Sequence, residues 1–369
     1  MREARRSNRA AALGLTLALA LVAPGAGRAS SRASVPHAAP AGTFVSLVPA
    51  CGCARRTDLD VFSTRTGRRV RTLASWATAF PAQLGTPAAD HRGQLFMTLT
   101  SSARCAVTGY MECPHWVPDS CTNVVETFVA GHARLDPVLR LPGSEQLGSV
   151  APSPEGSELA MTLAPCLALR GPTGLFIDDR ASGAVRPLLT TQNPCDGFGL
   201  PAWNPARTRL AFVLDRARGL PTPIAGGDTC PVATNRLAIV GSAGGGLTLI
   251  APDHGCAFAG VAFDRGGLAA AEGCRQGSPP GMSDTGSGDA YLLALDGRGR
   301  VRGRFALKRG LEQALVAAVP GTGDVLVTQD QPANQGPEFD WVWRFNGRTL
   351  APIAHYRAND AAQVLAVPW

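Results

Sequence analysis

The stretch CPHWVPDSC places a histidine, a tryptophan and an aspartate between two cysteines, at His115, Trp116 and Asp119. A histidine beside a carboxylate can move protons in a reaction, whereas a tryptophan on a loop is typical of the side chains that anchor a protein partner. A chain with six histidines is expected to place one on a loop by chance. We therefore assign His115 no catalytic role. We interpret His115, Trp116 and Asp119 as candidate ligand contacts, with Trp116 as the strongest candidate for a partner contact.

Four further polar residues flank segments that we expect to be loops: Asp196, Asp228, Asp253 and His254. In an enzyme, such residues would gather near the substrate, so they are candidates for ligand binding under either class of function. The sequence has no G-x-S-x-G, H-E-x-x-H or P-loop motif, the patterns that carry a nucleophile, a zinc site or a phosphate cradle. We assign no catalytic residue, and we expect neither a cofactor nor a metal.

Ten cysteines lie after residue 29, with no C-x-x-C pair and no Cys-His grouping of zinc-ligand spacing. An even number of cysteines in an exported chain favours disulfides over metal binding. Proximity in the sequence predicts one bridge inside residues 105–121, a bridge from Cys166 to Cys195, and a bridge from Cys256 to Cys230 or Cys274. The disulfide candidates are Cys51, Cys53, Cys105, Cys113, Cys121, Cys166, Cys195, Cys230, Cys256 and Cys274.

The N-terminus begins with the arginine-rich MREARRSNR, continues with the apolar AAALGLTLALALVAP and ends with the small residues of GAGRAS. This pattern predicts a signal peptide over residues 1–29, a disordered linker over 30–42, and a secreted or cell-envelope protein. The apolar run is shorter than the roughly 20 residues that span a bilayer, and we expect no membrane span in the mature chain.

After cleavage, 30 basic and 27 acidic residues remain, and no basic run is interleaved with aromatic residues. Nucleic acid is therefore not an expected partner. We expect a monomer that binds an extracellular protein or glycan.

The elements that must position these side chains occupy residues 43–369, where short apolar and β-branched strands alternate with Gly, Pro, Asp and Asn. One hairpin pattern recurs and can be aligned on an alanine. The anchor alanines are Ala88, Ala151, Ala202, Ala262, Ala318 and Ala366. A second hairpin accompanies the first, so four strands recur per repeat. This periodicity predicts an all-β, six-bladed β-propeller of four-stranded antiparallel blades.

Two copies of the hairpin, SPEGSELAM and NPARTRLAF, resemble the S-P-D-G-x-x-[LI]-A-F hairpin of TolB-type propellers, a WD40-like bacterial family usually built from six blades. This family includes periplasmic interaction proteins and the propeller domains of some peptidases, so the resemblance implies a scaffold rather than one reaction. We interpret Pro154, Gly156, Trp203 and Pro205 in these copies as residues that shape the turn and fill the space between blades.

A ring made from one chain must join its first blade to its last. The C-terminal AVPW is a truncated repeat, so we expect residues 362–369 to form the innermost strand of the first blade, beside the strand predicted over 43–50. A seventh blade built from residues 101–122 is the alternative.

We name the strands of each blade a to d from the centre outward. One face of the propeller then carries the long b–c connections and the d–a crossings, and all ten cysteines map to it. We call this the loop face, and the opposite one, with tight a–b and c–d turns, the turn face. Loops pinned on a rigid scaffold often form binding surfaces, although stabilisation against proteolysis explains the cysteines equally well. The sequence favours a secreted, non-enzymatic propeller that binds a protein, glycan or cell-wall ligand through the loop face. The alternative is a hydrolase or lyase with its site at the mouth of the central channel.

Overall fold

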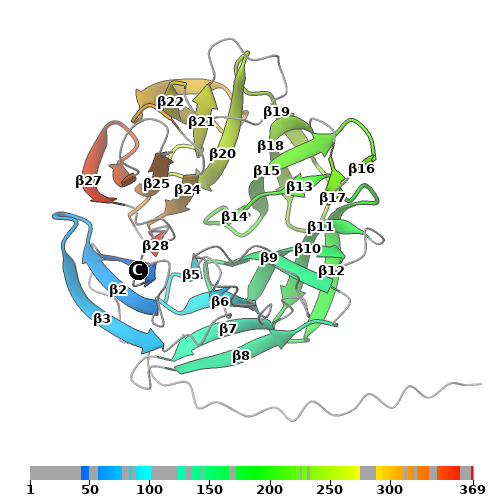
Figure 1. Ribbon diagram of the computed structural model, residues 1–369, viewed down its shortest axis with the longest axis horizontal. Coiled ribbons are helices and arrows are strands. Elements are labelled where there is room, and N and C mark those ends of the chain that lie inside the picture. Colours follow the sequence, from blue (N-terminus) through cyan, green and yellow to red (C-terminus); the bar gives the residue numbers. More distant parts are fainter. Residues whose placement is uncertain are drawn as a thin grey trace, which may run out of the picture. The chain divides into compact units, whose positions relative to one another are not determined.

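The fold was obtained as a computed structural model. It describes residues 43–49, 57–76, 83–84, 88–100, 124–129, 134–142, 145–165, 172–220, 222–224, 227–230, 233–274, 288–310, 314–319, 322–331, 339–357 and 367–368. These residues belong to one compact unit, Pro36–Trp369. They form strands and turns without a helix, and six sheets surround a common axis (Figure 1). The predicted all-β, six-bladed propeller is confirmed.

The first three blades are built from the N-terminal strands and one strand from the C-terminus. Blade 1 contains, from the centre outward, β28 (Val367–Pro368), β1 (Thr43–Pro49), β2 (Thr57–Ser63) and β3 (Arg69–Trp76). Blade 2 contains β4 (Gln83–Leu84) and β5 (Ala88–Ala89), which both pair with β6 (Leu95–Thr100), then β7 (Val124–Val129) and β8 (Arg134–Arg140). Blade 3 contains β9 (Glu145–Pro152), β10 (Glu158–Pro165), β11 (Thr173–Asp179) and β12 (Ala184–Thr191).

The remaining blades follow in chain order, and a small extra hairpin accompanies blade 4. Blade 4 contains β13 (Gly197–Phe198) and β14 (Ala202–Trp203), which both pair with β15 (Arg209–Ala217), then β18 (Ala233–Gly241) and β19 (Thr248–Ile250). The extra hairpin is β16 (Thr222–Ile224) and β17 (Gly227–Thr229). Blade 5 contains β20 (Cys256–Phe263), β21 (Leu268–Cys274), β22 (Ala290–Leu295) and β23 (Val301–Ala306). Blade 6 contains β24 (Ala314–Ala318), β25 (Val325–Gln331), β26 (Phe339–Phe345) and β27 (Leu350–Arg357).

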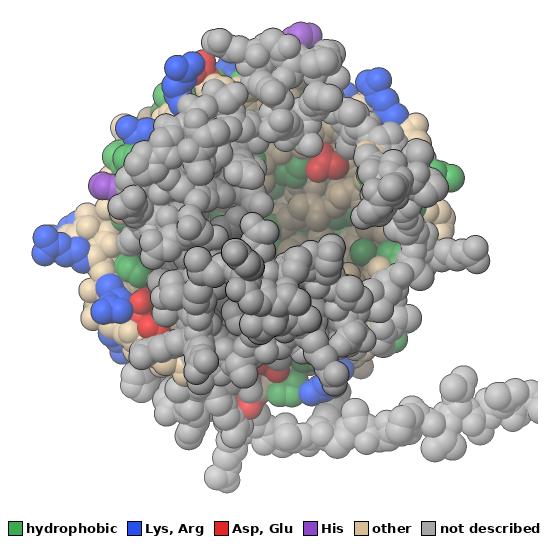
Figure 2. All heavy atoms as spheres, in the orientation of Figure 1, with side chains coloured by type: hydrophobic (Ala, Val, Ile, Leu, Met, Phe, Trp, Pro, Cys, Tyr) green, Lys and Arg blue, Asp and Glu red, His purple; other side chains and the backbone are tan. Residues whose placement is uncertain are grey.

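The core lies between neighbouring blades. Strand b is almost completely buried, as in β10 and β21, because blades cover both of its faces, whereas the outermost strand β12 is exposed along much of its length. Between blades 4 and 5, Phe258 and Val261 of β20 pack with Val213 and Ile239. In the space-filling view along the same direction, the centre is hollowed, and hydrophobic and acidic side chains line the described part of the hollow (Figure 2).

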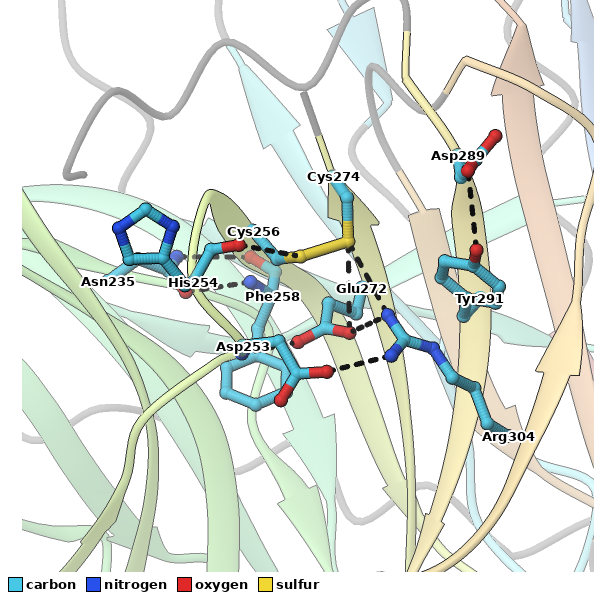
Figure 3. Close-up of a disulfide and its surroundings, with 10 residues drawn as sticks. All are labelled: Asn235, Asp253, His254, Cys256, Phe258, Glu272, Cys274, Asp289, Tyr291 and Arg304. Atoms are coloured by element: carbon cyan, nitrogen blue, oxygen red, sulfur yellow. Dashed lines mark hydrogen bonds and ion pairs between the residues drawn. A yellow bond between two sulfur atoms is a disulfide. The ribbon is translucent and has the colours of Figure 1, made fainter. Parts of the chain in front are cut away.

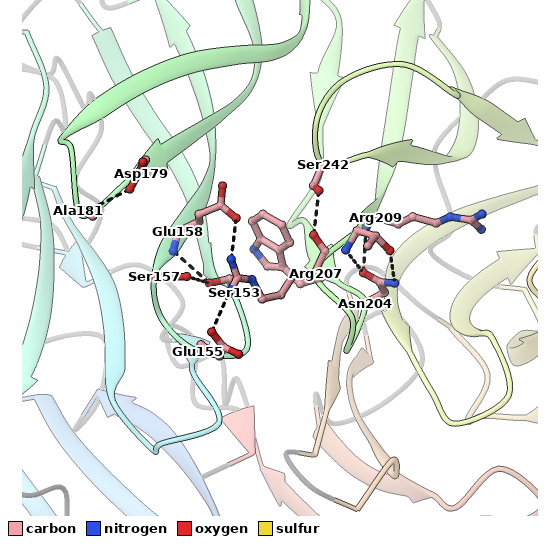
Figure 4. A network of polar contacts seen from close by, with 12 residues as sticks. Ser153, Glu155, Ser157, Glu158, Asp179, Ala181, Asn204, Arg207, Arg209 and Ser242 are labelled. Atoms are coloured by element: carbon pink, nitrogen blue, oxygen red, sulfur yellow. Dashed lines mark hydrogen bonds and ion pairs between the residues drawn. The ribbon is translucent and has the colours of Figure 1, made fainter.

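The a–b turns of blades 2, 3 and 4 share one hydrogen-bonding pattern. In each, the first turn residue offers a side-chain oxygen to backbone N–H groups that follow it. Asp90 Oδ1 accepts from the N–H of Gln94 at 2.9 Å. Ser153 Oγ accepts from the N–H of Glu158 at 3.1 Å, and Asn204 Oδ1 accepts from the N–H of Arg209 at 2.9 Å (Figure 4). Such side-chain acceptors stabilise tight turns. The geometry supports a folding role for the two family-like hairpins.

Arg207, in the a–b turn of blade 4, has a backbone conformation that is unusual for a residue with a side chain. Its φ of 60° lies in the left-handed region, which Gly156 occupies in the equivalent turn with φ 68° and which costs a side chain about 1–2 kcal/mol. Two contacts offset the cost (Figure 4): Arg207 Nη1 lies 2.6 Å from Glu155 Oε2 of the neighbouring blade, and Ser242 Oγ donates to the Arg207 carbonyl at 2.8 Å. This arginine therefore joins the a–b turns of blades 3 and 4.

The ring closes as predicted. Val367 and Pro368 of β28 pair with Val45 and Phe44 of β1, and β28 also contacts β5 and β24 of the adjacent blades. The C-terminal strand is thus the innermost strand of blade 1. The propeller has six blades, so the alternative of a seventh is wrong; the segment proposed for it, 101–122, lies outside the described residues.

Candidate functional site

Two disulfides lie on the loop face and staple equivalent places in consecutive blades. Cys195, in the crossing into blade 4, is bonded to Cys230 in the b–c connection of that blade, with a Cα–Cα distance of 5.4 Å. Cys256, the first residue of strand a in blade 5, is bonded to Cys274, the last residue of strand b, with a Cα–Cα distance of 4.0 Å. Each bridge therefore ties the entry of a blade to its own b–c connection.

The predicted bridge from Cys166 to Cys195 is wrong. Cys230 takes that place because the β16–β17 hairpin lies within the b–c connection and ends beside the crossing that contains Cys195. Cys256 pairs with Cys274, one of its two predicted partners, because the register of β20 and β21 sets these residues directly opposite each other. The other six cysteines lie outside the described residues.

A charged cluster surrounds the second disulfide (Figure 3). The backbone N–H of Asp253 donates to Glu272 Oε1 at 2.9 Å, and Arg304 lies between the two acidic side chains, 2.7 Å from Asp253 Oδ2 and 3.1 Å from Glu272 Oε2. Arg304 also lies 3.6 Å from Cys274 Sγ and covers the ring of Tyr291 at 3.8 Å from the centroid. We call Asp253, Glu272, Cys256, Cys274 and Arg304 the blade 5 cluster.

Glu272 is the buried member of this cluster. Its side chain is 0% exposed, against 60% for Asp253 and 38% for Arg304. Burial raises the pKa of the Glu272 carboxyl, while the N–H of Asp253 and the charge of Arg304 oppose the shift. Glu272 therefore links the crossing into blade 5 with strands b and d of that blade.

Blade 6 contains a neutral counterpart of Glu272. Gln329, also on strand b and 0% exposed, accepts from the N–H of Lys308 at 3.1 Å and donates to the carbonyls of Lys308 and Gly310 at 2.6 and 2.7 Å. Both side chains attach a d–a crossing to strand b. The main role of Glu272 is thus to position the exposed residues that precede Cys256.

A second polar group joins blade 4 to blade 5. Asn235 donates to Asp215 Oδ1 at 2.9 Å and to the Phe258 carbonyl at 3.1 Å, and its Oδ1 accepts from the Phe258 N–H at 2.7 Å. Burial raises the pKa of Asp215, although the Asn235 hydrogen bond favours its charged form. These contacts fix the loop-face ends of β15, β18 and β20.

The predicted site residues fall into separate groups. Asp196 is 5% exposed, accepts from the N–H of Ala217 at 2.8 Å and lies 3.5 Å from Arg216. Asp253 and His254 are exposed beside the second disulfide, and Asp228 is in β17. His115, Trp116 and Asp119 lie outside the described residues.

Sequence reasoning missed Glu272, Arg304 and Asn235. Glu272 carries the clearest signal, because a lone acidic residue in the apolar strand LAAAEGC is expected to need a buried partner. Its partner Arg304 is 32 residues away, and the pairing appears only when strands b, c and d align across the blade.

The chemistry available in the blade 5 cluster is recognition through charge. The sulfur atoms of Cys256 and Cys274 lie with a Glu272 oxygen within 4.8 Å of one another, but they are bonded together and so are not thiolate ligands. Asp253 and Glu272 are both engaged with Arg304. The exposed Asp253 and His254 and the half-buried Asp289 therefore present polar and charged groups beside a rigid staple.

Comparison with known proteins supports the fold alone. No protein-family model and no curated protein matches the sequence. Among solved structures, TolB from Acinetobacter baumannii is similar with a TM-score of 0.54 and 11% identity, over 88% of this chain and 66% of that protein, so the chain spans just under two thirds of its length. A Bacteroides caccae protein of unknown function has a TM-score of 0.49 and 11% identity, over 88% of this chain and 98% of that one. An oligogalacturonate lyase in complex with manganese has a TM-score of 0.47 and 12% identity, over 82% and 70%.

In the described part of the chain, no helix is long and apolar enough to cross a membrane. Six four-stranded blades, closure by β28 and the likeness to TolB agree with the family-like hairpins of blades 3 and 4. By fold, the chain is a TolB-like six-bladed β-propeller.

Proposed function

We propose that this protein is a secreted, non-enzymatic scaffold that binds a protein, glycan or cell-wall ligand through its loop face. The observation that carries the proposal is the placement of the two described disulfides, which each join the entry of a blade to the b–c connection of the same blade. Cross-links at the bases of loops restrict the conformations available to them and lower the entropy lost on binding. The a–b and c–d hairpins of the same blades need no such bridge, because they close through backbone hydrogen bonds.

The exposed groups indicate the chemistry of the partner. Asp253 and His254 extend from the crossing into blade 5, and Asp289, 45% exposed, lies 3.4 Å from Arg309 at the start of the next crossing. Acidic and basic side chains thus alternate along this rim, which suits a polar, mixed-charge partner better than an apolar one. Trp116 remains the predicted aromatic anchor in the long b–c connection of blade 2.

Export is part of the same proposal. A signal peptide over residues 1–29 would deliver the chain to an oxidising compartment, where disulfides persist. The two described disulfides are compatible with a cell-envelope or extracellular location. The alternative of a hydrolase or lyase requires carboxylates free to act on a substrate, whereas Asp196 and Asp253 each lie within 4 Å of an arginine nitrogen.

The test compares the two faces with matched substitutions. The mature, oxidised protein is immobilised and exposed to envelope proteins and cell-wall polysaccharides from the producing bacterium. We expect Trp116→Ala and Asp253→Asn to reduce retention of the bound component. Asp296→Asn, the same chemical change on the turn face, should leave it unchanged, since Asn346 makes the equivalent turn contacts in blade 6. Equal retention by all variants, or release of hydrolysed or eliminated sugar products, would contradict the proposal.

A further inference from the structure

A half-open pocket of about 110 Å³ is lined by residues at the inner strands of blades 2 to 6, and the repeat itself forms its wall. All the anchor alanines in the described part of the chain line it. They are Ala88, Ala151, Ala202, Ala262 and Ala318. Each stands at or near the end of strand a, close to the a–b turn, in blades 2 to 6 respectively. The cavity therefore belongs to the turn-face end of the channel and is separate from the disulfide-stapled loop face.

Apolar side chains dominate this wall. Leu200, Leu315 and Val316 contribute to it together with three prolines and Trp203. The Trp203 indole N–H already donates to the Ala151 carbonyl at 3.0 Å, so it does not require a polar ligand. None of the described lining residues is Asp, Glu, Lys or Arg.

His91 is the one ionisable side chain among the described lining residues. It is exposed at the rim, where its backbone N–H donates to the Pro154 carbonyl at 2.8 Å. Partial desolvation lowers the pKa of its imidazole, while Asp90 and Glu155 oppose the shift. Near neutral pH the neutral imidazole is thus favoured, and the described lining residues carry no fixed charge.

The pocket has rigid walls, and its anchor side chains are small, although those of Ala151 and Ala262 are themselves buried in the cores between blades. Each inner strand is hydrogen-bonded to strand b, as β20 is to β21 over most of its length and β24 is to β25 over all of it. A leucine at the anchor position would extend three further carbon atoms, whereas alanine leaves the space open. An enclosed apolar cavity of about 150 Å³ in another protein binds benzene or xenon. The pocket here is half open, and its volume of about 110 Å³ is of the size that accommodates a compact apolar molecule.

We propose that this cavity is a binding site for a small, uncharged, apolar molecule of about the size of benzene. The proposal does not rest on the loop-face function, because the two sites share no residue. The apolar lining supplies the attraction. The described lining residues offer no Asp, Glu, Lys or Arg side chain to compensate the desolvation of an ionic analogue, so we expect such analogues not to bind.

The test uses benzene itself, with benzoate as its charged analogue. Calorimetric titration of the mature, oxidised protein should show saturable binding of one benzene per chain, while benzoate should neither bind nor compete. Ala202→Leu, at a half-buried position, and Ala318→Leu, at an exposed one, should each weaken benzene binding by about tenfold or more because they occupy the space. Ala181→Leu, in the exposed c–d turn of blade 3, is the matched control and should bind like the parent.

Two outcomes would overturn the proposal. Absence of saturable benzene binding by the parent protein would show that the space does not accept an apolar ligand. Unchanged binding in both filled variants, with cooperative unfolding retained, would place the benzene elsewhere. Because Ala318 is exposed, Ala318→Leu keeps the test decisive even where Ala202→Leu fails to fold.

Discussion

Removing the Glu272 oxygen that accepts from the Asp253 N–H tests whether this side chain holds the crossing into blade 5 in place. We expect Glu272→Ala to be less stable than Glu272→Gln by about 2–4 kcal/mol. Both variants lack the charge, so their comparison leaves out the cost of burying a carboxylate. The glutamine retains an oxygen for the Asp253 N–H, which Glu272 now accepts at 2.9 Å, in the way that Gln329 accepts the Lys308 N–H in blade 6.

The magnitude follows from two contributions. An orphaned backbone donor costs about 1–3 kcal/mol, and loss of the buried Cγ methylene of a fully buried side chain costs about 0.8 kcal/mol more. The sum is a large share of the roughly 5–15 kcal/mol that stabilise a typical domain. Urea denaturation of the oxidised proteins at neutral pH gives the free energies of unfolding. Stabilities that agree within about 0.5 kcal/mol would show that Glu272 does not secure the crossing and would refute the reasoning.

Three further predictions follow from particular contacts. Burial raises the pKa of Glu272, so its contribution to the free energy of unfolding is present at low pH and is lost as the pH rises through the folded-state pKa. The stability of the parent relative to Glu272→Gln should fall across that window by up to about 1.36 kcal/mol per pH unit. A difference in stability that stays constant with pH in urea denaturation would contradict this. Deleting residues 362–369 removes β28 from β1 and should lower the free energy of unfolding by several kcal/mol; an unaltered melting temperature would disprove closure by this strand. Arg207→Gly should be more stable than Arg207→Ala by about 1 kcal/mol, since both lose the contact with Glu155 and only glycine relieves the left-handed backbone; equal melting temperatures would count against strain at this turn.

The blade pattern could be predicted because each hairpin is encoded locally. Alternating apolar residues and a turn residue that accepts backbone N–H groups recur at Asp90, Ser153 and Asn204, so the sequence alone predicts the repeat. Closure of the ring could also be predicted, because a truncated last repeat can complete only the first blade, which lacks an innermost strand of its own. The anchor alanine was visible as a pattern, but its part in lining a cavity was not, since that depends on how five blades meet.

Contacts between segments remote in the sequence were not predictable. Cys195 lies 35 residues from Cys230, and the Gly- and Pro-rich stretch between β15 and Cys230 indicates a loop, although it contains the β16–β17 hairpin. The partnership of Arg304 with Glu272 depends on register across three strands of one blade. The left-handed conformation of Arg207 was also not predictable from the repeat, because the equivalent position in blade 3 is Gly156. A contact with Glu155 of the neighbouring blade stabilises this conformation.

Hydrogen–deuterium exchange of the oxidised protein, with and without its retained ligand, tests loop-face binding most directly. Binding through the loop face predicts slower exchange in residues 193–197 and 251–256, which contain Cys195 and Cys256. It predicts the same in residues 217–220, which hydrogen-bond to the first of these segments. The same account predicts unchanged exchange in the a–b turns at residues 153–158 and 204–209. Protection confined to those turns, with the loop-face segments unaffected, would contradict it.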